Sequence, residues 1–165
     1  AIGTQHEVWE YHANNAGAPK MEPLGKCDRC FMPRVGHVTG DMQIHEMEWG
    51  DDELWFVNTL FSCLAVRSVQ YSFLPKWQPP FISALAPEDR CHLNGLGLRD
   101  GQIRYVTALG QSDEAAGWRK RKKDGGLVMD TTTNEVLVDR LAFDFDSRIC
   151  QLAKSPRAGY LHRLT

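Results

Sequence analysis

The chain has 165 residues and a formal net charge of −2 at pH 7, with 19 Lys and Arg against 21 Asp and Glu. Hydrophobic residues make up 42% of the sequence and charged residues 24%, which is typical of one folded globular domain and excludes wholesale disorder. Because the charge is near neutral and no apolar run approaches the roughly 20 residues of a membrane helix, we expect neither a nucleic-acid partner nor a membrane partner.

Strand patterns dominate the chain. The segment Ala1–Tyr11 predicts a pair of short strands, with Ile2 on one and Val8 and Trp9 on the other. Further hairpins are predicted for residues 43–47 with 54–60, 93–98 with 103–109, and 126–130 with 136–141. In the second of these, the turn contains Asp100-Gly101, a strong hairpin signal. The fold class predicted from these patterns is all-β.

Two of the hairpins are similar to each other in sequence. IHEMEWGDDELWFVNTL from Ile44 aligns without a gap with LNGLGLRDGQIRYVTAL from Leu93, which lies 49 residues later. A repeat of about 40 to 50 residues made of antiparallel strands has the size of one β-propeller blade, which needs neighbours to bury its faces. The alternative is two unrelated hairpins that look alike by chance.

The segments between the hairpins are of two kinds. Tyr71–Pro87 contains four prolines, which exclude a central strand or a long helix, and we expect an ordered loop whose aromatic side chains pack over a blade junction. Ser112–Gly126 contains five consecutive basic residues, Arg119 to Lys123, which are typical of a solvated loop or helix face. Phosphate or nucleic-acid contact is the lesser alternative for that run, because the rest of the chain has no basic excess.

The five cysteines are an odd number, which argues against a closed disulfide framework and favours a reducing, cytoplasmic location. Cys27 and Cys30 form a C-x-x-C pair, the spacing of two zinc ligands. A structural zinc site needs about four ligands, and the sequence has no second C-x-x-C pair. The favoured interpretation is therefore that these two cysteines lie in a loop and bind no metal. Cys63 and Cys91 are expected to be buried and unreactive rather than nucleophilic.

Several longer motifs are distinctive, among them FVNTLFSCL from Phe56, PPFISALAPEDRCHLNGL from Pro79 and RYVTALG from Arg104. They resemble an uncharacterised bacterial family, a domain of unknown function whose members are longer than this chain and look like β-propellers. The resemblance implies a partial propeller of about three four-stranded antiparallel blades at residues 1–141, near 1–32, 33–87 and 88–141. Residues 142–165 depart from the family pattern, and we expect an irregular or helical tail there.

The same resemblance suggests a shortened member of the family, opening in the middle of a blade. About three blades cannot close a ring, and open sheet edges invite pairing with another copy. We therefore expect a homodimer that covers the exposed edges. A looser resemblance links HLNGLGLRDGQIRYVTALG from His92 to the gluconolactonase and senescence-marker type of propeller, and it implies that Asn94 is the candidate metal ligand.

Polar residues precede both of the similar hairpins, where the inner strands of a propeller line the channel. His45, Asp89 and His92 are the candidate catalytic residues, because imidazole and carboxylate groups carry protons or bind cations. Asp41, Asn58 and Arg90 are the candidate ligand-binding residues. The structural alternative is that the aspartates cap turns, the histidines bond the backbone between blades and Asn58 bonds ladder groups.

Two functions remain open at this point. The first is a non-catalytic binding or assembly module for a small-molecule or protein partner, favoured because the sequence has no cofactor motif and no acid–base signature. The second is a metal-assisted hydrolase or lactonase-like enzyme with its site at the mouth of the channel. We expect no organic cofactor, and a divalent metal only in the second case.

Overall fold

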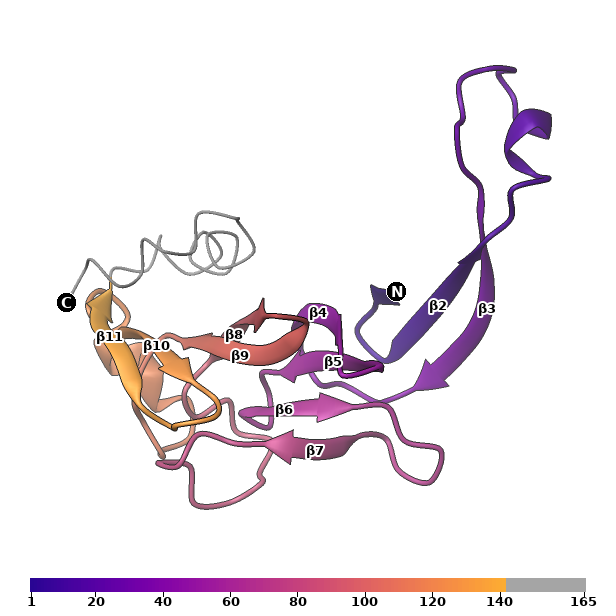
Figure 1. The fold of residues 1–165 in the computed structure, drawn as a ribbon. Coiled ribbons are helices and arrows are strands. Elements are labelled where there is room, and N and C mark those ends of the chain that lie inside the picture. Colours follow the sequence, from indigo (N-terminus) through magenta and orange to yellow (C-terminus); the bar gives the residue numbers. More distant parts are fainter. Residues whose placement is uncertain (142–165) are drawn as a thin grey trace.

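The computed structural model describes residues 1–141, which form three antiparallel β-sheets (Figure 1). The first sheet has the order β1 (Ile2–Gly3), β2 (Glu7–Ala13), β3 (Phe31–Val38). The second has the order β4 (Ile44–Gly50), β5 (Glu53–Asn58), β6 (Cys63–Val66), β7 (Leu74–Trp77), and the third has β8 (Leu93–Arg99), β9 (Gln102–Ala108), β10 (Gly126–Asp130), β11 (Val136–Leu141). The helical turns in this part of the chain are two 3₁₀ turns, η1 (Ala18–Lys20) and η2 (Gly117–Arg121). The all-β prediction is therefore confirmed.

The β4–β5 and β8–β9 hairpins share their turn geometry. Gly50 pairs with Glu53 in one and Arg99 with Gln102 in the other, at positions 49 residues apart. Both central residues of each turn have positive φ, as a two-residue type I′ turn requires. Four pairs of residues at this offset have positive φ: Gly40 and Asp89, Gln43 and His92, Asp51 and Asp100, and Asp52 and Gly101. The backbone conformation thus agrees between the hairpins and also between the segments that lead into them.

The second and third sheets share one hydrophobic core. Val57 and Leu64 from the second sheet pack with Leu93, Leu96 and Val106 from the third, and all five are fully buried. Burying a large aliphatic side chain contributes about 1.5–3 kcal/mol, so this interface holds the two sheets together. A second cluster of Met42, Phe56, Cys63 and Ala65 lies on the other face of the second sheet.

The segment expected to be an ordered loop contains the edge strand β7. Pro75 lies in this strand, which pairs only with β6, and an edge is where a strand tolerates proline. Trp77 and Phe81 pack against the core between the second and third sheets, and Phe73 packs against the second cluster. The aromatic side chains of this segment therefore cover the sheet junctions.

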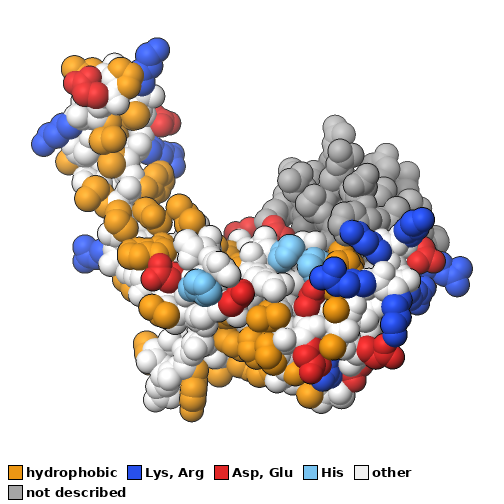
Figure 2. Space-filling model, turned by 180° about the vertical axis from the view of Figure 1, so that it is seen from behind, with side chains coloured by type: hydrophobic (Ala, Val, Ile, Leu, Met, Phe, Trp, Pro, Cys, Tyr) orange, Lys and Arg blue, Asp and Glu red, His pale blue; other side chains and the backbone are white. Residues whose placement is uncertain are grey.

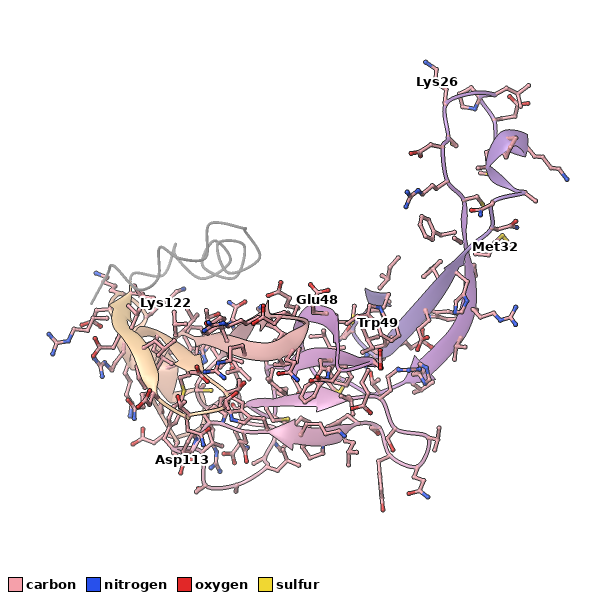
Figure 3. All side chains as sticks on the ribbon, viewed as in Figure 1. Lys26, Met32, Glu48, Trp49, Asp113 and Lys122 are labelled. Atoms are coloured by element: carbon pink, nitrogen blue, oxygen red, sulfur yellow. The ribbon has the colours of Figure 1, made fainter. Side chains whose placement is uncertain are left out.

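The first sheet is the smallest of the three, with three strands. Its last strand, Phe31–Val38, pairs along β2 from Glu7 to Ala13. This strand spans residue 33, near which the second repeat was expected to begin. β2 and β3 project from the other sheets as an arm, with Lys26 at its tip and Met32 just below the tip loop (Figures 1 and 3).

The expected irregular or helical tail, residues 142–165, lies outside the described residues. Residues 1–141 contain no helix with the length and apolarity needed to cross a membrane.

Candidate functional site

His45, Asp89 and His92 meet where β4, the first strand of the second sheet, lies beside the segment that leads into β8. The rings of His45 and His92 form an edge-to-face contact with centroids 4.9 Å apart. His92 Nδ1 lies 3.0 Å from both carboxylate oxygens of Asp89. Two histidines that are 47 residues apart in sequence and one aspartate therefore form a single cluster, which we call the histidine cluster.

Local backbone conformation brings His92 onto Asp89. Both residues have positive φ, 46° for Asp89 and 50° for His92, so the chain turns sharply here before entering β8. The turn folds the imidazole back over the carboxylate three residues earlier. The backbone N–H of Asp89 donates a 2.8 Å hydrogen bond to Leu60 O, which ties the turn to the second sheet. Left-handed conformations are uncommon outside glycine, and they gather at functional or tightly packed sites.

Trp118 completes the cluster, and the sequence analysis did not identify it. Its indole Nε1 donates a 2.9 Å hydrogen bond to Asp89 Oδ2, and its ring lies 4.3 Å from the His92 ring. Trp118 is 5% exposed and belongs to η2, at the start of the basic run. One large aromatic residue in an otherwise charged segment was the available signal, because such a residue usually anchors the segment to a core.

The arrangement determines what His92 can do chemically. An ionised carboxylate only accepts hydrogen bonds, so Nδ1 of His92 donates to Asp89 and Nε2 is left to act as an acceptor or to take a proton. Because Asp89 is 9% exposed and also accepts from Trp118, its position is well defined. An imidazole oriented in this way can bind a polar ligand or carry a proton.

The three candidate ligand-binding residues have structural contacts. Asp41 Oδ1 accepts from Gln43 N at 3.2 Å, which is a turn-capping bond. Asn58 is fully buried, and its Oδ1 accepts from Phe61 N at 3.1 Å. Arg90 donates to Glu88, Ser83 and Asp113 rather than to Asp41 or Asp89.

Arg90 and Asp113 tie the loop before β8 to the loop before η2. Arg90 Nη1 lies 2.7 Å from Asp113 Oδ1, and the same oxygen accepts from Ser83 N at 2.9 Å. Hydrogen bonds to Asp113 lower the pKa of its carboxyl group to about 2. Those from Ser83 have the largest effect, and the one from Arg90 adds to it. The bonds to Glu88 and Asp113 raise the pKa of Arg90.

The candidate metal ligands are dispersed. Asn94, half-buried on β8, occupies the position that His45 has on β4, 49 residues earlier. Cys27 and Cys30 are free thiols in the tip loop of the arm. Across residues 1–141, His, Cys, Asp and Glu form no group of three or more with the geometry to hold a metal ion.

Cys63 and Cys91 are buried, as expected. Both are fully inaccessible, and burial raises the pKa of each thiol to about 12. Cys91 and His92 are sequence neighbours, but Cys91 points into the core between the second and third sheets, whereas His92 is partly exposed. A thiol that stays protonated is a poor nucleophile.

A second polar cluster links the first sheet to the second. Glu10 on β2 is 8% exposed and forms an ion pair with Arg67, and His37 Nε2 lies 3.2 Å from Glu10 Oε1. A cavity of about 150 Å³ beside it is lined in part by His37, Arg67 and Ser68. Because Glu10 neutralises Arg67, we interpret this cluster as an electrostatic link between the two sheets.

Comparison with known proteins adds one assignment. A family model for a domain of unknown function, DUF4915, matches residues 1–152. No curated protein and no solved structure shows significant similarity to the chain. Since the model spans most of the chain and every residue of the histidine cluster, the chain belongs to the DUF4915 family.

Proposed function

We propose that this chain is a binding module built on a partial β-propeller, with the histidine cluster as its ligand site. The observation that carries the proposal is the contact between His45 on β4 and His92 just before β8, which brings together the starts of two successive sheets. In propellers, ligands bind where the inner strands of several blades converge, because side chains from different blades meet there.

The sheet arrangement supports the propeller interpretation. The second and third sheets are each four-stranded and antiparallel, with β4 and β8 as the first strand of each. β4 and β8 contact each other, and the Glu46 side chain on β4 accepts a 2.8 Å hydrogen bond from Leu96 N on β8. Consecutive sheets that pack face to face, with their first strands adjacent, have the arrangement of propeller blades.

Ligand-observed NMR with a library of small polar metabolites tests the binding role. We expect at least one compound to bind the wild-type protein, and to bind His92→Asn and His45→Asn about tenfold or more weakly. The control is His12→Asn, since His12 is exposed on the arm. If no compound binds, or if all three variants bind equally well, the cluster is not a ligand site.

A second candidate is a metal-assisted hydrolase or lactonase-like enzyme. It is favoured by the hydrogen bond between His92 and Asp89, which orients an imidazole for proton transfer. This function predicts that Ca²⁺, Mn²⁺ or Zn²⁺ raises the melting temperature, since a ligand that binds only the folded state stabilises it. It also predicts that Asn94→Ala and His92→Ala each abolish the increase. Unchanged melting temperatures with all three ions would remove this candidate.

A further inference from the structure

The segment that supplies Trp118 also brings positive charge to the histidine cluster. Residues 112–125 contain five basic residues, Arg119 to Lys123, and three acidic ones, whereas the whole chain carries a net charge of −2. Figure 2 shows Lys and Arg side chains gathered beside a pair of His side chains on one face. Figure 3 labels Asp113 and Lys122, which lie near the two ends of this segment beside the third sheet.

Most of the nearby acidic groups already have partners. Asp89 accepts hydrogen bonds from His92 and Trp118. Arg90 forms ion pairs with both Glu88 and Asp113. Glu114 forms an ion pair with Lys120. Within residues 1–141 these pairings leave Arg119 without a carboxylate partner, and its side chain contacts the Trp118 ring. The positive charge of Arg119 is therefore not cancelled by a direct ion pair in this part of the chain.

Arg119 is held beside the cluster by stacking. Its guanidinium carbon lies 4.8 Å from the centroid of the Trp118 ring, and that ring lies 4.3 Å from His92. A cation–π contact restrains the guanidinium but leaves its N–H donors for a ligand. Two imidazoles and a guanidinium are groups that bind carboxylate and phosphate oxygens.

We infer that the histidine cluster binds a small organic anion, and that Arg119 contacts its carboxylate or phosphate group. The inference rests on the proposed binding function and adds to it the charge class of the ligand. In its protonated form His92 donates a hydrogen bond from Nε2, and the N–H groups of Arg119 donate as well, while the Trp118 ring contacts both side chains.

Imidazole ¹H–¹⁵N NMR with inorganic phosphate and with acetate tests this inference at constant ionic strength. We expect one or both anions to shift the ring resonances of His45 and His92, and the stronger effect identifies phosphate or carboxylate as the group bound. Arg119→Gln should raise the dissociation constant about tenfold or more, because it removes a charge-assisted hydrogen bond to the anion.

Lys120→Gln is the matched control, since it removes one positive charge from the same run but from a residue paired with Glu114. We expect it to change the dissociation constant less than about twofold. Equal weakening by both substitutions would show that only the general charge of the run matters, and no shift with either anion would also overturn the inference. If neutral metabolites bind at His45 and His92 while anions do not, the binding function stands and the charge class is wrong.

Discussion

The hydroxyl of Thr59, the residue after β5, donates a 2.6 Å hydrogen bond to the backbone oxygen of Leu93, the first residue of β8. Both residues are fully buried, so this bond joins the second and third sheets inside the protein. The acceptor, Leu93, directly follows His92, so this hydrogen bond fixes where β8 begins relative to the second sheet.

Thr59→Val should destabilise the protein. The substitution keeps the shape of the side chain but leaves a buried carbonyl oxygen without this donor, which costs about 1–3 kcal/mol. The free energy of unfolding, measured by urea denaturation, should fall by that amount. Thr132→Val, in an exposed turn, is the control and should change it by less than about 0.5 kcal/mol. A Thr59→Val value as small as the control would show that water replaces the bond.

Asp113→Asn should destabilise the protein at pH 7 but not in strong acid. The folded state lowers the pKa of Asp113 from 3.8 to about 2. Its stabilising contribution is therefore present above the pKa of the unfolded chain and is lost as the pH falls toward 2. Urea midpoints of wild type and variant should differ at pH 7 and converge between pH 4 and pH 2. Asp100→Asn is the control, because the Asp100 side chain is 92% exposed. A difference between the urea midpoints of wild type and Asp113→Asn that persists at pH 2 would contradict this account.

The four described cysteines should divide into two reactive and two protected thiols. Cys27 is exposed and Cys30 is half-exposed, whereas Cys63 and Cys91 are buried with a thiol pKa of about 12. In a Cys150→Ser background, a thiol reagent such as DTNB at pH 8 should modify two groups in the native protein and four after denaturation. Rapid modification of Cys63 or Cys91, identified by mass spectrometry, would show that the core opens more readily than the packing indicates.

Gly110→Ala should disturb the histidine cluster from a distance. A Cβ atom at Gly110 would lie 3.0 Å from Trp118 Cα and 3.1 Å from its Cβ, so the backbone of η2 would have to move. We expect a loss of about 1–3 kcal/mol, as for other overpacked sites, and a shift of the His92 ring resonances. Gly3→Ala is the control, because its Cβ would meet only flexible side-chain atoms at ordinary distances, the nearest at 3.4 Å. Unchanged His92 resonances in Gly110→Ala would mean that Trp118 does not set the ring's position.

The arm should take part in self-association. Its outer strand, β3, exposes Phe31 and Val38 by 54% and 75% and pairs on one side only. Exposed apolar edge strands pair with other chains, so we propose a homodimer formed through this edge. Light scattering coupled to size-exclusion chromatography should show a dimer for wild type and a monomer for Val38→Lys. The control is Val69→Lys, in an exposed loop, which should remain dimeric. A monomeric wild type would refute the proposal.

Local sequence was sufficient to predict most of the strands. The β10–β11 hairpin was predicted at the residues where it forms, and the two similar hairpins were predicted within a few residues of their ends. Turn residues such as Asp100-Gly101 favour one backbone conformation whatever surrounds them, so hairpins can be predicted from neighbouring residues. The extent of the first sheet was not predicted, because Phe31–Val38 is a strand only through its pairing with β2 across a loop.

The sequence by itself determined that His45, Asp89 and His92 lie at or just before the first strands of two similar hairpins, and that an aromatic residue interrupts the charged segment near Arg119. Only the tertiary structure decided that Trp118 bonds Asp89 and that Arg90 bonds Asp113. The physical reason is that these contacts join segments more than twenty residues apart, and they depend on how one sheet stacks on the next. The positive φ of His92 also turns its ring toward Asp89, a direction that strand alternation alone does not predict.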